Sequence, residues 1–579
     1  MHRHTSARGR ITWIASGLLM LCLMPQSQAG QVGAPLSDNA AERLASNALF
    51  GIRGLPQGKP TAPINYNHEP LPQAPVIRSN SATRELQVEL RAAYASRSFT
   101  TLRNGQSVTE QLYLRSYNGQ PVGPTLVTRP GDTLKIRLVN DLPPDIPMPH
   151  CNAHGVCNHN FPHHFNTTNL HTHGLHVDPN GKSDNVFIRL ANGQAFDYEI
   201  EIPADHPAGT FWYHAHMHGS TSVQVGSGMA GALIVEGDYD RTPRLKTADK
   251  RTILLQEIAF DQDGRIENND TYAPTAWTDQ AAQRGWHISL NGKVMPEIRL
   301  QPGEVELWRL IHGGVRKLLN LRLVAACASG PTVPLVQLAA DGIPFSSKRL
   351  AVDHGVFLAP GYRSDVAVRA IQPGLYYLID SESPTAALEL PASYCDRQRG
   401  DAPLVLDGHA QNILARVVVS GFPRSMAYPR NAQLARLNRP DPIADHELAA
   451  LPQYVRFDID ISRAPWVGLI NGKAYDPEQP RILKLGEAQT WYISSVFSHH
   501  PFHIHVNPFE IIQRDANGNI VDRYWKDTIN TPEIDPNDEA GSTIEARMRY
   551  RDFSGAFVSH CHILDHEDHG MMEKVVIQP

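Results

Sequence analysis

Long apolar runs are scarce in this sequence. The one candidate, Ile11–Met24, is shorter than the roughly 20 apolar residues that a membrane-spanning helix needs. Basic residues precede it, and the small-residue tripeptide Ser27-Gln28-Ala29 follows it. This pattern predicts a secretory signal peptide over residues 1–29 and an exported protein, periplasmic or extracellular, that leaves the membrane after cleavage. An uncleaved anchor is the alternative.

Positive charge is not in excess either. The chain has 53 Lys and Arg against 59 Asp and Glu, a formal net charge of −6 and an isoelectric point near 6.5. This balance offers no basic surface to nucleic acid or to anionic lipid. We therefore expect no nucleic-acid partner.

Extended helical patterns are rare, whereas short strands and Gly/Pro turns are frequent, as is typical of β-sandwiches. An Asn-Gly hairpin signal followed by two alternating strands occurs at Asn118, Asn291 and Asn471. The spacings of 173 and 180 residues are too long for a solenoid and predict three tandem domains of one fold. We place them at residues 79–240, 241–425 and 426–579, after an extension or linker over residues 30–78.

The segment HCHILDHEDHGMM, residues 560–572, offers ligands to two different metal sites. On a strand, successive side chains point to opposite faces, so Cys561 faces one way and both flanking histidines the other. Cys561, His566 and Met571 form the soft thiolate, imidazole and thioether set of a blue-copper centre. His560 and His562 are left for a second metal cluster.

Three further histidine groups accompany this segment. Chance placement of 28 His in 579 residues would give about 1.3 His-x-His pairs; six are present, one of them in the signal segment. The odd step from His500 to His503 reverses the strand face, so His500 can join Cys561 while His503 joins the other cluster. The groups are HTHG (His171, His173), HAHMHG (His214, His216, His218) and HPFHIH (His500, His503, His505).

These motifs, in this order, make the chain resemble the three-domain multicopper oxidases, and among them the bacterial laccase-like members. The resemblance implies an all-β fold of three tandem cupredoxin-like Greek-key sandwiches. It also implies four copper ions (one type 1, one type 2, two type 3), with a small reductant and dioxygen as partners of a monomer. The implied ligands are His500, Cys561, His566 and Met571 for type 1, His171 and His503 for type 2, and His173, His214, His216, His505, His560 and His562 for type 3.

The ligand groups fall in the first and third domains, which predicts a trinuclear cluster between them. The second domain has only scattered histidines, at 287, 312 and 354, which we interpret as packing or surface residues. Its expected role is to hold the other two domains at the right distance and to wall a substrate cleft.

Two carboxylates are candidates for delivering the protons that oxygen reduction consumes. Glu567 follows His566 directly, and Asp184 lies downstream of HTHG, where similar oxidases carry acidic residues. Positioned carboxylates are common proton donors. The alternatives are a turn-forming role for Asp184 and a solvated surface charge for Glu567.

Cysteine is sparse as well, with six in the chain. If Cys22 leaves with the signal peptide and Cys561 binds copper, an even number remains, which suggests two disulfides in an exported protein. We favour the local pairs Cys151–Cys157 and Cys327–Cys395; reduced, packed cysteines are the alternative. Five histidines crowd the first pair, at 150, 154, 159, 163 and 164; a disulfide-closed surface loop is favoured there over an accessory metal-loading loop. His218 and His499 lie beside predicted ligands but do not fit the ligand pattern, so we assign them to no metal site.

The leading functional hypothesis is one-electron oxidation of phenols and aromatic amines with reduction of dioxygen to water. A metallo-oxidase acting on Cu(I), Fe(II) or Mn(II) is the alternative. The chain after residue 29 has only eight Met and no Met-rich run, which weakens the Cu(I) case alone. The full ligand set argues against a copper-free relative, and the type 3 histidines argue against a copper nitrite reductase.

Overall fold

The computed structural model describes most of the chain after residue 68. The described residues are 69–103, 106–145, 151–152, 156–258, 266, 287–326, 332–351, 355–381, 413–463, 465–535, 538 and 542–579. The predicted signal peptide, Cys327 and Cys395 lie outside them. Among them, no helix is both long and apolar enough to cross a membrane.

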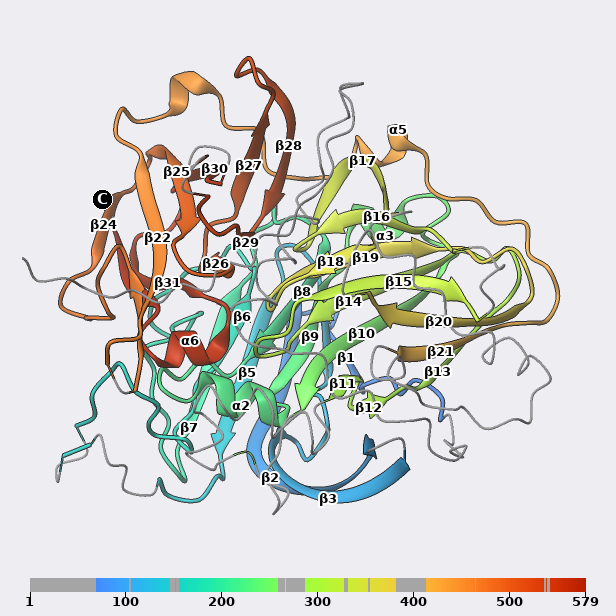
Figure 1. The fold of residues 1–579 in the computed structure, drawn as a ribbon, viewed down its shortest axis with the longest axis horizontal. Coiled ribbons are helices and arrows are strands. Elements are labelled where there is room, and N and C mark those ends of the chain that lie inside the picture. Colours follow the sequence, from blue (N-terminus) through green and yellow to red (C-terminus); the bar gives the residue numbers. More distant parts are fainter. Residues whose placement is uncertain are drawn as a thin grey trace, which may run out of the picture. The chain divides into compact units, whose positions relative to one another are not determined.

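The elements are almost all strands, gathered in six sheets (Figure 1). Each third of the chain contributes two sheets, and a buried apolar cluster lies between the two. The described helices are short: α2 (Thr221–Ser227), α3 (Asp238–Arg241), α5 (Asn431–Leu434), the 3-10 turn η5 (Asp445–Glu447) and α6 (Leu564–Asp568).

The first third packs a five-stranded sheet against a four-stranded one. On β5, alternate residues are buried, as expected for a strand with one face on the core, and Leu134, Ile136 and Leu138 are fully buried. The sheets are β1 (Val76–Arg78), β4 (Thr125–Thr128), β9 (Ala230–Val235), β8 (Gly209–His214) and β6 (His171–His173), and β3 (Gln106–Tyr117), β2 (Glu85–Arg103), β5 (Thr133–Asn140) and β7 (Ala195–Glu201).

The second third packs a seven-stranded sheet against a five-stranded one around Trp308 and aliphatic side chains. The first sheet is β12 (Lys293–Val294), β11 (His287–Leu290), β10 (Asp249–Ile258), β14 (Glu306–His312), β19 (Arg363–Val368), β16 (Leu335–Ala340) and β17 (Ile343–Ala351). The second is β13 (Glu297–Leu300), β21 (Ile413–Val419), β20 (Gly374–Asp380), β15 (Leu319–Ala325) and β18 (Val356–Leu358).

The last third buries Trp491, Phe502, Cys561 and Met571 in one core between its two sheets. The first sheet is β23 (Val467–Ile470), β22 (Gln453–Asp460), β25 (Ala488–Ser495), β30 (Ile544–Arg549), β27 (Phe509–Arg514) and β28 (Ile520–Lys526). The second is β24 (Arg481–Lys484), β32 (Met572–Gln578), β31 (Gly555–Cys561), β26 (His500–Ile504) and β29 (Thr528–Thr531).

The three thirds share one topology. In the first sheet, β3-β2-β5-β7 corresponds to β11-β10-β14-β19 and to β23-β22-β25-β30, and the central pair is parallel each time. In the second sheet, β4-β9-β8-β6 corresponds to β13-β21-β20-β15 and to β24-β32-β31-β26. The sequence repeat is thus a repeat of strand order, and we interpret the chain as three tandem β-sandwiches.

The three Asn-Gly turns adopt the conformation expected of tight hairpins. Asn118, Asn291 and Asn471 have φ between 51° and 55°, and the glycine after each also has a positive φ. Each Asn side chain accepts a hydrogen bond from a backbone amide on the first strand of its sandwich, and its own side-chain amide donates to the backbone carbonyl two residues before that one. The amide and the carbonyl belong to Arg91 and Glu89 for Asn118, to Leu254 and Thr252 for Asn291, and to Arg456 and Tyr454 for Asn471.

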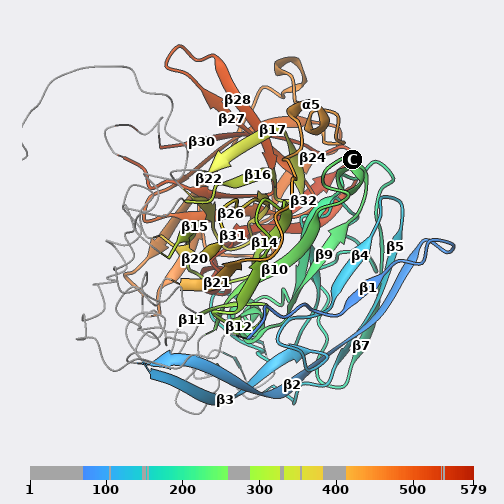
Figure 2. The ribbon, with the colours of Figure 1, turned by 90° about the vertical axis from the view of Figure 1, so that its right-hand side faces the viewer.

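The β2–β3 hairpin extends beyond its own sandwich (Figures 1 and 2). The two strands pair over twelve positions, from Ala92–Tyr117 to Arg103–Gln106. Phe99, Leu112 and Leu114 on this ribbon pack into one apolar cluster with Val294 and Tyr377 of the second sandwich. The ribbon therefore ties the first two sandwiches together.

The short helix α6 is held to the second sandwich by a buried ion pair. Arg316 follows β14, and its Nε donates to Asp565 Oδ1 at 2.7 Å while a second guanidinium nitrogen pairs with Oδ2. Asp565 is fully buried. Because α6 also carries His566 and Glu567, this ion pair fixes residues that the sequence assigns to the metal sites.

The ion pair gives a stability test. Arg316→Ala leaves the Asp565 carboxylate buried without its cation, so the free energy of unfolding should fall by about 3–5 kcal/mol. Arg551→Ala is the matched control, since its 4.0 Å pair with Asp552 is half-exposed and should contribute about 0–1 kcal/mol. Guanidinium denaturation of both variants measures the two losses. Equal losses would contradict a structural role for the Arg316–Asp565 pair.

Candidate metal centre

Strand pairing brings the predicted ligands opposite one another. In the first sandwich, β6 runs antiparallel to β8 with His171 opposite His214. In the third, β26 runs antiparallel to β31 with His503 opposite His560 and Phe502 opposite Cys561. The equivalent pair in the second sandwich, β15 and β20, has Leu321 opposite Asp380 and carries no histidine.

Histidines of the first and third sandwiches then meet face to face. The rings of His171 and His505 stack with centroids 3.7 Å apart, and those of His173 and His503 with centroids 3.8 Å apart. All four side chains are buried. The histidines of the first and third sandwiches therefore share one buried site, which the positions of the ligand motifs along the chain predict.

The ligand atoms of this site fall into three groups, each within 4.8 Å. Every group mixes the first and third sandwiches. In one group, Nε2 of His216 lies 3.2 Å from Nε2 of His560 and 3.1 Å from Nε2 of His505. The groups are His173, His214 and His562; His216, His505 and His560; and His171, His503 and His505.

Backbone carbonyls fix the tautomer of several rings. Nδ1 of His214, His503 and His560 donates to the carbonyl oxygens of Ala215, Asp527 and Cys561 at 2.8–2.9 Å. Because a carbonyl can only accept, Nε2 of each ring carries a lone pair. Nε2 of His171, His173, His214 and His503 is buried without a hydrogen-bond partner among the described residues.

Burial also sets the charge of these rings. Desolvation lowers the pKa of His214 to about 3 and that of His560 to about 4. It lowers the pKa of the other histidines of this site well below the usual value; these are His171, His173, His216, His503, His505 and His562. Neutral imidazole is the ligand form of histidine. The converging ring nitrogens, several of them without a hydrogen-bond partner among the described residues, fit bound cations.

Asp184 contacts this site from outside. Its Oδ2 accepts a hydrogen bond from His171 Nδ1 at 2.8 Å, and its Oδ1 accepts one from the Thr172 amide at 2.7 Å. Burial raises the pKa of Asp184 to about 7. A carboxylate on the outer nitrogen orients a metal-binding histidine and fixes its tautomer. Asp184 is therefore more than a turn residue.

Glu567 contacts two histidines of one group. Its Oε1 lies 3.4 Å from His216 Nδ1, and its Oε2 lies 3.2 Å from His560 Nδ1. Thr221 Oγ1 donates to Oε1 at 3.2 Å. The side chain is fully buried, which rules out the solvated surface charge, and burial raises its pKa well above the usual value.

A separate group of ligands lies on the opposite side of β31. His500, Cys561 and His566 have their ligand atoms within 4.8 Å, and Cys561 Sγ lies 4.0 Å from His566 Nδ1. Burial raises the pKa of the Cys561 thiol well above its usual value, so a cation is needed to hold it as thiolate. The alternation along β31 thus separates Cys561 from His560 and His562.

The two neighbouring methionines pack differently. Met571 belongs to the same apolar core as Cys561, and its carbonyl accepts a hydrogen bond from the Cys561 amide at 3.0 Å. Met572 packs instead with Val186, Tyr475 and Val558. Met571 therefore shares its apolar core with the thiol, whereas Met572 does not.

Sequence reasoning missed a residue of the second sandwich. Arg363 on β19 is buried, and its guanidinium pairs with both carboxylate oxygens of Asp527, with Nη1 to Oδ1 at 2.8 Å. The same Nη1 lies 3.2 Å from His173 Nδ1. A Cβ on Gly361 would meet the His562 ring at 2.8 Å. The second sandwich thus contributes residues to the lining of the site.

The remaining histidine expectations have mixed outcomes. Cys151 and Cys157 form the expected disulfide, while His150 and His154 lie outside the described residues. His159, His163 and His218 lie close together, away from the groups above. His499 is buried next to His500, with Nδ1 2.9 Å from the Thr531 carbonyl.

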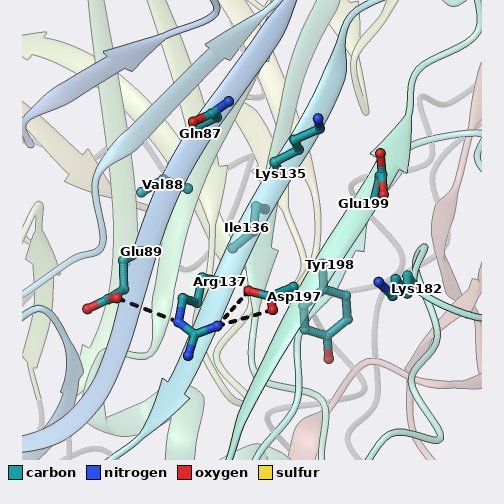
Figure 3. A pocket seen from close by; sticks show the side chains of 10 residues that line it. All are labelled: Gln87, Val88, Glu89, Lys135, Ile136, Arg137, Lys182, Asp197, Tyr198 and Glu199. Carbon is teal, nitrogen blue, oxygen red and sulfur yellow. Dashed lines mark hydrogen bonds and ion pairs between the residues drawn. The ribbon is translucent and has the colours of Figure 1, made fainter.

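The pocket drawn in Figure 3 is unrelated to these sites. It lies over β2, β5 and β7, and its charged residues pair with one another. Arg137 lies 2.9 Å from Asp197 and 3.9 Å from Glu89. None of the predicted ligands lines it.

The chain is similar to known proteins over the segments that carry these histidines. Two family models described as multicopper oxidase match residues 156–240 and 448–579. A multicopper oxidase of Staphylococcus aureus is 24% identical over 478 residues, covering 80% of this chain and 83% of the relative. A laccase of Bacillus subtilis is 25% identical over 501 residues, covering 80% of this chain and 90% of the relative.

Solved structures show the same fold. A Campylobacter jejuni multicopper oxidase, described as a metallo-oxidase, superposes with a TM-score of 0.64 at 21% identity, covering 94% of this chain and 99% of that one. A laccase-like multicopper oxidase of Ochrobactrum sp. gives 0.63 at 24% identity, covering 88% and 100%. The predicted all-β, cupredoxin-like class is confirmed. The chain is similar to multicopper oxidases in sequence and in fold, and these similarities support an oxidoreductase.

Proposed function

We propose that this chain binds four copper ions and oxidises small reductants one electron at a time. The observation that carries the proposal is the convergence of bare, buried imidazole nitrogens next to a separate thiol-containing group. His500, Cys561 and His566 would hold the type 1 copper with Met571 as axial ligand, and His171 and His503 the type 2 copper. The type 3 pair would be held by His173, His214 and His562 on one side and by His216, His505 and His560 on the other.

The bound ions would supply the one-electron steps and the reduction of dioxygen to water. The protein holds their ligands in place: Asp184 orients His171, the Cys561 carbonyl orients His560, and Glu567 lies beside the Nδ1 atoms of His216 and His560. Burial of every ligand excludes water. The strand segment from Cys561 to His560 and His562 is the direct covalent link between the two sites.

We propose phenols and aromatic amines as the reductants. Trp466 lies beside the type 1 group, with its ring 5.2 Å from His566 and stacked at 4.3 Å on His569. This half-buried aromatic surface suits a planar aromatic donor. The solved relatives differ on this point: one is described as a metallo-oxidase, and the other as active towards lignin model compounds.

A substrate comparison tests that choice. The copper-loaded protein should turn over a phenol and an aromatic diamine with higher kcat/KM than it does Cu(I), Fe(II) or Mn(II). Oxygen consumption measures all five on one preparation. Higher kcat/KM for a metal ion would replace this proposal with metal-ion oxidation while leaving the copper assignment intact.

The type 1 assignment predicts the effect of Cys561→Ser. The variant should lose one copper of four and its intense blue absorbance, because serine cannot provide the thiolate. Elemental analysis and the visible spectrum measure both. Met572→Leu is the control and should keep the colour, since Met572 packs in a different cluster. A colourless wild-type protein, or a Cys561→Ser variant that stays blue, would disprove the assignment.

We also propose that Glu567 and Asp184 supply protons to the oxygen-reducing site, because both are buried and contact its histidines. Asp527 also approaches two of these histidines, but it is paired with Arg363. Glu567→Gln keeps the size and hydrogen bonding of the side chain but removes its proton. Anaerobic reduction by substrate should stay near normal, while reoxidation by dioxygen should slow by roughly 10². Stopped-flow measurements separate the two halves.

Glu573→Gln is the matched control on the same segment, since Glu573 pairs with Arg481 and contacts no ligand. Copper content is measured in both variants. Slower anaerobic reduction alone, or copper loss in Glu567→Gln, would assign Glu567 to another role.

A further inference from the structure

A second set of histidines lies outside the four groups proposed for copper. We call His159, His163 and His218 the outer histidine cluster. Their ring centroids are 6.2 Å apart for His159–His163, 6.1 Å for His159–His218 and 5.9 Å for His163–His218. Two of the three ring pairs are edge-on.

These spacings are close to those of the inner type 3 groups. In the group of His173, His214 and His562, the centroids lie 5.0–5.8 Å apart. The outer histidine cluster is wider, by 0.9 Å at its shortest pair (5.9 against 5.0 Å) and by 0.4 Å at its longest (6.2 against 5.8 Å). Three imidazoles at such spacing can reach a common ion with small ring rotations.

Hydrogen bonds fix which nitrogen is bare on two of the rings. His163 Nδ1 donates to the Phe161 carbonyl at 2.7 Å, and His218 Nε2 donates to the His159 carbonyl. His163 Nε2 and His218 Nδ1 therefore carry lone pairs. His218 Nδ1 is buried with no hydrogen-bond partner in the described part of the chain. An orphaned acceptor of this kind is costly unless something binds it.

The surrounding backbone holds the cluster together. The His163 amide donates to the Gly219 carbonyl at 2.7 Å, and the His163 ring lies so close to Gly219 that a Cβ there would meet its Nδ1 at 2.3 Å. The Cys151–Cys157 disulfide closes the loop before His159. The Tyr475 ring, from the third sandwich, lies 4.7 Å from the His218 ring.

Charge keeps His159 and His163 in the ligand form. Burial lowers the pKa of His163 to about 4, and it lowers the pKa of the exposed His159 as well. The Arg189 cation adds to both shifts, while Asp476 acts against it at His159. With Arg189 nearby, affinity for a cation should be lower than at the inner groups.

We propose that the outer histidine cluster is a further metal site, for a late first-row divalent ion such as Zn(II), Ni(II) or Cu(II). Three neutral imidazoles are the donors these ions share. His159 is exposed, so the ion can exchange with solvent, unlike one held by the inner groups. The site uses none of the residues proposed to bind the four coppers, so it stands independently of the proposed function.

Zinc binding to the copper-loaded protein tests this site. Isothermal titration calorimetry with Zn(II) should show one additional ion per chain. His159→Ala should weaken that binding by at least about tenfold, since even the loss of a partner outside the ligand shell costs 10- to 100-fold. His159 is exposed, so folding should be unaffected. His218→Gln should weaken binding similarly.

The controls separate this site from surface binding and from the copper centres. His446→Ala removes another exposed histidine and should leave Zn(II) affinity unchanged. The blue absorbance and copper content of every variant should equal those of the wild type. No additional Zn(II) in the wild type would overturn the proposal. Binding that survives both His159→Ala and His218→Gln would do so as well.

Discussion

The structure depends on a set of buried imidazole nitrogens that face one another, several of them without a hydrogen-bond partner among the described residues. Each unpaired buried polar atom costs about 1–3 kcal/mol, and the inner site contains several such atoms. Only a cation satisfies all of them together. Because each histidine group of the shared site takes ligands from both the first and the third sandwich, metal binding there also joins two parts of the chain that lie hundreds of residues apart.

The second sandwich has the same strand topology as its neighbours but lacks their histidines. Strands β15 and β20 occupy the places of β6 and β8, and of β26 and β31, yet they carry apolar residues with Asn320 and Asp380 in place of histidines. The Asn320 amide donates to the Asp380 carboxylate at 2.8 Å, which uses locally the polar groups at this position. This sandwich contributes two cationic side chains to its neighbours. Arg316 pairs with Asp565 on α6, and Arg363 pairs with Asp527 at the edge of the histidine site.

Much of this could be predicted from sequence, because local patterns carry it. The spacing of the Asn-Gly turns indicates the repeat, and the alternation of side chains along a strand places Cys561 on the opposite face from His560 and His562. The role of Arg363 could not be predicted, since its partner Asp527 is 164 positions away and neither residue belongs to a motif. Nor could Arg316, whose partner is 249 positions away. The neighbours of His218 could not be predicted either, because only the fold brings its ring next to those of His159 and His163.

The asparagine of each Asn-Gly turn bonds to the first strand of its own sandwich, including the sandwich without ligands. These bonds are local in sequence and need no metal. Each sandwich can therefore close on its own strands soon after its last strand is available, and the histidine faces meet afterwards. Pairing of the strands within each sandwich and acquisition of the metal are thus separable events, so the proposed copper ions can enter sandwiches whose own strands are already paired.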